Sequence, residues 1–170
     1  MSVCCPPGGA RSPGVGVVPG GFDRAHARVS GQHLLGRRVR ARGIELGRSV
    51  DLLLDPSQGR VLALDVLCGD GRNRLLPLAA ATIGLDELVL PSALVLIDDE
   101  EGAFYRQRTI RLSSLRGVPV ERDARTVGHL RDLVLDPEGR IAALLVDDGE
   151  GDGAVPWSGA LNLGAGLLRC

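Results

Sequence analysis

The sequence contains no lysine and very few aromatic residues. All 20 basic residues of the 170-residue chain are arginine. Because a phosphate-binding P-loop needs a lysine after its glycines, this absence excludes that class of nucleotide site. The only aromatic residues are Phe22, Phe104, Tyr105 and Trp157. The core must therefore be aliphatic, and a broad platform for stacking nucleic-acid bases is not expected.

Cysteine is also scarce, and its spacing is uninformative. Cys4, Cys5, Cys68 and Cys170 include no C-x-x-C pair, which argues against a structural zinc site. The positions are typical of reduced thiols and not of a disulfide framework. Residues 1–20 lack the basic and apolar regions of a secretory signal. We therefore expect a cytoplasmic protein.

Motifs for catalysis or metal binding are missing too. No G-x-S-x-G elbow surrounds a serine. His129 is expected on a strand edge, where an imidazole is ordinarily solvated or hydrogen-bonded to a helix or turn end. The acidic runs at 98–101 and 147–152 would suit calcium, but they lack the EF-hand pattern, so we interpret them as solvated segments. The sequence predicts no enzyme, no metal and no cofactor.

The charge balance gives little reason to expect nucleic acid. The formal net charge is -1 and the pI is about 6.3. Residues 105–125 nevertheless hold several arginines, so Arg106, Arg108 and Arg111 are candidate RNA contacts with Tyr105 as a stacking residue. The interpretation we favour is a linker whose arginines pair with the acidic run that precedes it.

One apolar stretch resembles a membrane span. Residues 75–97 are largely apolar, but Asp86 and Glu87 lie at their middle, and Pro77 and Pro91 interrupt any helix. A central Asp alone costs roughly 2.5–3.5 kcal/mol on insertion. We predict buried strands joined by a turn at 85–87, and no membrane span.

A repeated phrase is the clearest feature of the sequence. "DLLLDPSQGRVLAL" at 51–64 is followed by "DLVLDPEGRIAAL" at 132–144. The aspartate, proline and glycine of each copy suit a tight turn, so each phrase predicts a β-hairpin. Matching residues before the turn are 81 positions apart, and the spacing falls to 80 and then 79 after the turns. Such changes confined to loops are typical of a duplicated fold.

The two copies resemble the PRC-barrel family, whose repeat orders a glycine, a valine, a second glycine, an aspartate-flanked strand, a turn and a late proline. The first copy matches at Gly36, Val39, Gly47, Asp51, Asp55, Gly59 and Pro77, and the second at Gly117, Val120, Gly128, Asp132, Asp136, Gly139 and Pro156. The resemblance implies small β-barrels that act as interaction modules without catalytic residues of their own.

We therefore predict an all-β protein of two small PRC-type β-barrels packed on each other. The expected ranges are a flexible tail at 1–31, a first barrel at 32–97, a linker at 98–111 and a second barrel at 112–170. The predicted function is a non-enzymatic protein-interaction or regulatory module, with a protein partner or a homo-oligomer. The alternative is an RNA- or ribosome-associated assembly factor, the role of one family member.

Trp157 is the remaining candidate residue. As the sole tryptophan, it could close a core with its ring. It could equally anchor an interface between the two units or with another protein. The sequence leaves both interpretations open.

Overall fold

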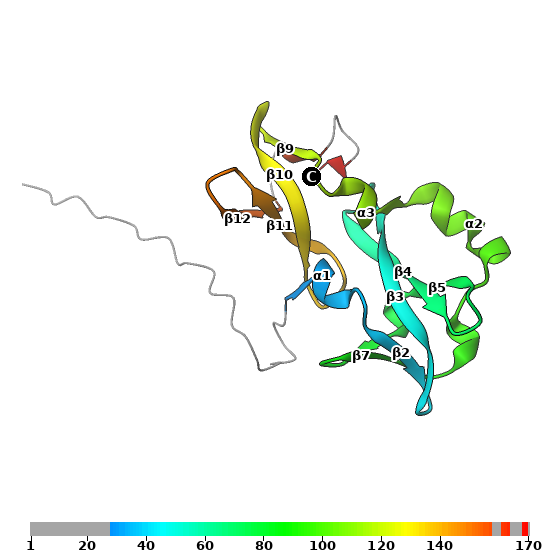
Figure 1. Cartoon of the computed structure of the whole chain (residues 1–170). Coiled ribbons are helices and arrows are strands. Elements are labelled where there is room, and N and C mark those ends of the chain that lie inside the picture. The colour runs from blue at the N-terminus through cyan, green and yellow to red at the C-terminus, as the bar shows by residue number, and fades with distance from the viewer. Residues whose placement is uncertain (1–27, 158–160, 164–167, 170) are drawn as a thin grey trace, which may run out of the picture.

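The computed structural model describes residues 28–157, 161–163 and 168–169. These residues form two seven-stranded sheets and a few helices. Figure 1 shows the two sheets side by side, with the strands of the second half on one side and those of the first half on the other. The chain is thus mostly β, as predicted, and both repeated phrases form hairpins.

The first sheet has the strand order β5-β4-β3-β2-β7-β6. We call these strands the first unit. Their bounds are β2 (Arg38–Ala41), β3 (Ile44–Asp55), β4 (Arg60–Cys68), β5 (Asn73–Pro77), β6 (Thr82–Ile83) and β7 (Glu87–Leu90). Two short 3₁₀ helices, η1 (Leu78–Ala80) and η2 (Ala93–Val95), complete it. The predicted turn at 85–87 indeed joins two strands.

The second sheet has the order β12-β11-β10-β9-β13-β14, and we call it the second unit. Its first four strands repeat the order β5-β4-β3-β2, but β13 pairs antiparallel with β9 whereas β7 pairs parallel with β2. Its strands are β9 (Pro119–Arg122), β10 (Arg125–Leu135), β11 (Ile141–Asp147), β12 (Asp152–Pro156), β13 (Leu161–Leu163) and β14 (Leu168–Arg169). Each unit therefore has one long strand, β3 or β10, which pairs with both of its chain neighbours.

A short leader before each unit pairs with the other unit. The first leader is β1 (Val29–Ser30) followed by α1 (Gly31–Leu34), and β1 pairs with β10. The second leader is β8 (Ile110–Arg111) followed by α3 (Leu112–Leu115), and β8 pairs with β3. The register is equivalent, since Val29 faces Leu135 while Ile110 faces Leu54. The units are thus related by a local twofold with exchanged leaders.

An aspartate of each unit caps the leader that it receives. Both carboxylate oxygens of Asp132 accept from the backbone N–H of Gln32, at 3.1 and 2.9 Å. The Asp51 carboxylate accepts from Ser113 N at 3.2 Å and from Ser113 Oγ at 2.5 Å. The first amides of a helix have no partner within it, so these carboxylates satisfy donors that would otherwise be left unpaired.

The two repeated hairpins also meet each other. Val61 N donates to Gly139 O at 2.8 Å, and Ile141 N donates to Gly59 O at 2.9 Å. Because these two bonds are equivalent, the local twofold passes between the hairpins.

The Asp55 carboxylate caps its own turn through Ser57 N and Oγ. Burial works to raise the pKa of Asp55, but the bonds from Ser57 and Gln58, with Arg108 nearby, hold it below its ordinary value.

One core serves both units. A single cluster of buried aliphatic side chains includes Leu52, Leu54 and Leu64 of the first unit together with Leu133 and Leu144 of the second. The leaders contribute fully buried leucines to the same cluster. A unit of this size buries only about 60% of the surface of its unfolded chain, so sharing a core provides burial that one unit lacks. The predicted packing of the two units on each other is observed.

The segment predicted as a linker at 98–111 is ordered. It forms α2 (Asp99–Arg108) and then β8, and Tyr105 of α2 packs on a small cluster of Leu53, Ala63 and Leu75. Figure 1 shows α2 lying beside β4 and β5. Of the tail predicted at 1–31, residues 1–27 lie outside the described residues, while Val29–Ser30 forms β1.

Closed barrels, which the resemblance implied, are not seen among the described residues. Each strand path is open, with β5 and β6 at the two ends of one sheet and β12 and β14 at those of the other. The leaders β8 and β1 pair with the ends of the long strands β3 and β10 and do not join the two ends of either sheet. The architecture is two open, twisted sheets around a shared core.

At the contact between the hairpins, Gly139 has a positive φ and little room for a side chain, and both features can be tested. Its φ is +78°, and an added Cβ would lie 2.6 Å from Leu78 Cδ2. Gly139→Ala should therefore lower the free energy of unfolding by both the backbone strain, about 1–3 kcal/mol, and the clash. Gly117→Ala is the matched control, because Gly117 has φ +77° with no neighbour within 4 Å. Equal losses in urea unfolding would contradict a tight contact between Leu78 and the Gly139 turn.

Candidate interaction surface

The three arginines singled out from the sequence lie beside the first sheet. Arg106 and Arg108 belong to α2, and Arg111 pairs with Asp65 of β4. Arg108, near the end of α2, lies 5.1 Å from the centroid of the exposed Phe104 ring, a cation–π distance. Arg106 is half-buried on the same helix. Phe104 also meets Tyr105 edge to face, with the ring centroids 6.0 Å apart. The contact of Arg108 with Phe104 thus lies within α2, and Tyr105, which packs on the first sheet, is half-buried and not presented as a stacking surface.

Arg111 has the most demanding internal role. Its guanidinium lies 2.9 Å from Asp65 Oδ2, and the Asp65 side chain is completely buried on β4. Asp65 faces Asp51 directly across the β3–β4 pair, so two carboxylates are neighbours on one side of the sheet. The second leader places Arg111 over one of them and Ser113 over the other. Arg111 thus neutralises a charge that would be costly to bury alone.

Trp157 lies at the contact between the units. Its backbone N donates to Ala142 O at 3.0 Å, and its half-buried ring packs against the shared core. A Cβ added at Gly59 would lie 3.0 Å from Trp157 Nε1, so the indole covers the hairpin turn of the first unit. Leu78 covers Gly139 in the same way. Of the two interpretations of Trp157, the structure supports both core closure and an anchor between units.

An exposed, arginine-rich face lies on the open half of the first sheet. Val39, Ala41 and Leu88 point into the core, so the residues alternating with them point outward. We define the arginine face by these outward residues: Arg38, Arg40, Glu45, Arg48, Leu67, Glu87 and Val89. α2 and the second leader cover the other half of the same side, around Leu53 and Asp65.

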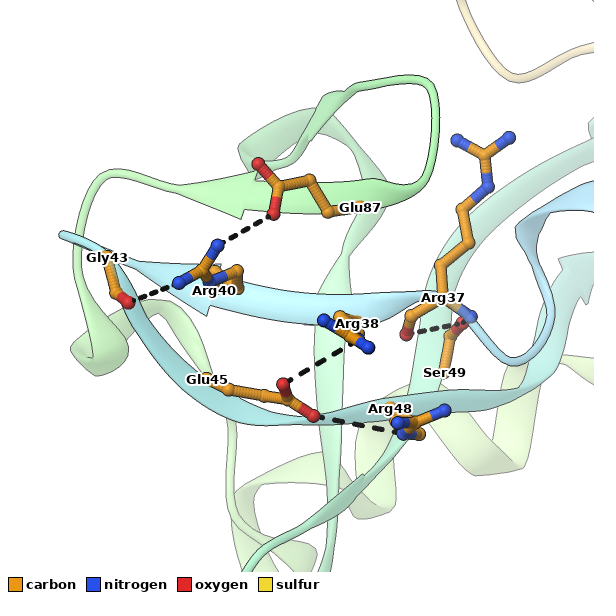
Figure 2. A network of polar contacts seen from close by, with 8 residues as sticks. All are labelled: Arg37, Arg38, Arg40, Gly43, Glu45, Arg48, Ser49 and Glu87. Atoms are coloured by element: carbon orange, nitrogen blue, oxygen red, sulfur yellow. Dashed lines mark hydrogen bonds and ion pairs between the residues drawn. The ribbon is translucent and has the colours of Figure 1, made fainter.

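Figure 2 shows the polar network of this face. Glu45 bridges Arg38 and Arg48 at 3.8 Å each, and Arg40 reaches Glu87 at 3.3 Å and the carbonyl of Gly43 at 2.7 Å. The side chains of Arg38 and Arg48 remain 59% and 58% exposed. Exposed ion pairs of this kind contribute about 0–1 kcal/mol. Their value to the fold is therefore small, and the guanidiniums stay accessible.

Arg37 belongs to the neighbouring framework and not to this face. Its guanidinium donates to the carbonyls of His33 and Gly84, which ties the first leader to the β6–β7 turn. Burial lowers the pKa of Arg37, partly offset by Asp86. Its backbone N also donates to Ser49 Oγ at 3.2 Å. Arg37 is thus a structural residue at the border of the arginine face.

The described part of the chain holds no cluster of metal ligands. No group of three or more His, Cys, Asp or Glu residues there could hold a metal ion. A shallow hollow of about 340 Å³ lies between the first leader and β10, lined by residues including Gln32, Arg116, His129 and Asp147. His129 and Arg131 are exposed there, and Arg131 pairs with Asp152.

Sequence reasoning missed the arginine face. Arg38, Arg40 and Arg48 are spread over two strands, and only the β2–β3 register brings Arg38 opposite Arg48 and Arg40 opposite Glu45. A signal was nevertheless present, because Arg38 and Arg40 alternate with the apolar Val39 and Ala41. Such alternation is typical of a strand with one solvated side.

Comparison with known proteins agrees with the repeat. Residues 107–169 match the family model described as the PRC-barrel domain, which confirms the resemblance seen in the sequence. The match spans the end of α2, the second leader and the second unit. No curated protein matches the chain. Among the described residues, no helix has the length and apolar character needed to cross a membrane.

The Asp65–Arg111 pair can be tested against the second unit, whose equivalent positions are Leu145 and Ser30. Arg111→Ser should lower the free energy of unfolding by about 3 kcal/mol, because it strands a buried charge. The double change of Asp65→Leu with Arg111→Ser should recover most of this loss. Chemical denaturation of the three proteins checks it. A double variant as unstable as the single one would contradict this role for Arg111.

Proposed function

We propose that the chain is a non-enzymatic protein-interaction or regulatory module built from two PRC-type units. The family match supports this for the second unit, and the four corresponding strands and the equivalent leader registers extend it to the first. The buried carboxylates need no catalytic role to account for them, because each has a structural partner. Asp51 and Asp132 cap the leaders, and Asp65 pairs with Arg111.

One observation carries the proposal. Every large hydrophobic side chain that is markedly exposed in the described residues belongs to the first unit or to the segment after it. They are Ile44, Val50, Leu67, Leu85, Val89, Leu94 and Phe104, with exposures that reach 93% at Leu94. Exposed apolar side chains that concentrate on one part of a protein mark interaction sites. The second unit, which matches the family, buries its large apolar side chains more completely.

The duplication explains how this division arose physically. Each unit contributes half of one core, so the fold restricts substitutions of the core residues in both units. The outer side chains face no such requirement. A scaffold of two units can thus retain its packing in both while one of them presents apolar and basic groups to a partner. We expect the partner to contact the first unit and to be a protein.

The alternative, an RNA- or ribosome-associated assembly factor, would use the accessible guanidiniums. Two of the three arginines named from the sequence are poorly placed for this, because Arg106 is half-buried and Arg111 neutralises Asp65, whereas Arg108 is exposed on α2. The exposed Arg38 and Arg48 would be the phosphate contacts instead. Binding of this kind weakens steeply with salt.

Affinity capture from native lysate, with and without ribonuclease, tests the proposed function. The chain should retain specific proteins after ribonuclease treatment. Leu94→Ser together with Phe104→Ser should reduce their recovery about tenfold, since apolar anchors dominate such interfaces, while the exposed sites leave the fold intact. Glu138→Ser, at an exposed turn of the second unit, is the control.

Two results would count against the proposal. Complete loss of the captured material after ribonuclease would favour the RNA alternative. Equal recovery by the double variant and the control would show that the exposed apolar residues of the first unit do not contact the partner.

A further inference from the structure

The outer faces of the two units occupy equivalent positions but differ in charge. The strand registers match them residue by residue. Arg38 lies opposite Arg48, which lies opposite Leu67 and then Asn73, whereas the equivalent row is Pro119, His129, Asp147 and Asp152. The next row changes Arg40 and Glu45 into Glu121 and Thr126. At these positions the second unit thus lacks the arginines of the first unit and has more acidic residues.

The second face is open to solvent. We define the acidic face as Pro119, Glu121, Thr126, His129, Asp147 and Asp152. All of these are exposed except Glu121, which is half-buried. Asp148 and Glu150 in the adjoining β11–β12 turn are exposed as well and extend the negative charge. Arg131 pairs with Asp152, and Arg116 lies at the border of this face, in the hollow that Asp147 also lines, so two arginines stand beside the carboxylates of the face and its turn.

Neither face contacts the other within one chain, because both are solvent-exposed on units that meet through their hairpins and leaders. Their charges are nevertheless complementary, and their strand frameworks are equivalent. Arginine forks bind carboxylates with defined geometry. Leu67 and Val89, exposed by 44% and 39%, add apolar area to the arginine face.

We propose that the arginine face of one molecule binds the acidic face of a second copy of this chain. The inference rests on the proposed interaction role and identifies one partner for the first unit. The contact is head to tail, because two different surfaces meet. Such heterologous contacts leave one free face of each kind at the ends, so assembly proceeds into open chains or rings. Guanidiniums of Arg38 and Arg48 are the groups that meet Asp147 and Asp152.

Sedimentation equilibrium of the full chain at a series of concentrations tests the proposal. The average mass should rise above that of a monomer with concentration at about 20 mM salt and fall towards it at about 500 mM, where charges are screened over a few ångströms. Arg38→Glu with Arg48→Glu should weaken association about tenfold or more. Asp147→Arg with Asp152→Arg should do the same.

The charge swap is the decisive arm. A chain with all four substitutions exchanges the charges of the two faces and should associate again to within a few-fold of the wild type. Arg140→Glu is the matched control, because Arg140 is exposed at the opposite end of the second sheet. It should associate as the wild type does.

The outcomes separate this inference from the proposed function. A wild-type chain that remains monomeric at low salt and high concentration overturns self-association, even if it captures other proteins. Association that survives both double reversals overturns the choice of faces. Binding of an RNA oligonucleotide to the arginine face, with no rise in mass, would also overturn the proposal.

Discussion

The structure depends on one exchange, in which each unit holds the leader of the other. Asp132 binds the first turn of α1, and Asp51 binds the first turn of α3. Beside each cap a two-residue strand pairs with the long strand of the partner unit. Buried amides without partners are costly, so these carboxylates direct the leaders across the twofold. Removing the exchange would take one short strand from each sheet and the buried leucines of the leaders from the shared core.

This constraint explains why so much of the repeat is conserved between the halves while the outer faces differ. The residues that the exchange uses are retained: Asp51 and Asp132, the hairpin glycines, and the apolar residues of the core. Elsewhere the units have diverged. The first adds the Asp65–Arg111 pair and the covering helix α2, and its open face is basic where that of the second is acidic. A symmetric frame thus presents two chemically distinct surfaces.

The sequence predicted the parts of this arrangement that are local. Asp55, Pro56 and Gly59 predicted a turn, and the repeated phrase predicted two similar hairpins; both hairpins are present. The family resemblance is confirmed for residues 107–169. The exchange was not predicted, because its strands join segments far apart in the sequence through backbone groups that every residue has; the two capping contacts beside them span 100 and 62 residues. Closed barrels were expected from the family resemblance. No sequence pattern revealed that each leader pairs with the long strand of the other unit.

The site was less predictable than the fold. A run of arginines at 105–125 drew attention as a potential RNA contact, yet the structure places Arg108 on Phe104 and Arg111 on a buried carboxylate. The accessible arginines lie on separate strands, and their proximity follows from cross-strand register. Trp157 was left with two interpretations, because its contact with Gly59 depends on the twofold. Surface chemistry here is a product of tertiary pairing.

The exchange is the central claim, and backbone nuclear Overhauser effects test it most directly. Facing residues of paired strands are close enough to give such effects, so cross-peaks are expected between Val29 and Leu135 and between Ile110 and Leu54. These should persist on dilution, because both pairs lie within one molecule. Cross-peaks that join Val29 to β3 or Ile110 to β10 would instead place each leader on its own unit, and that result would contradict the account.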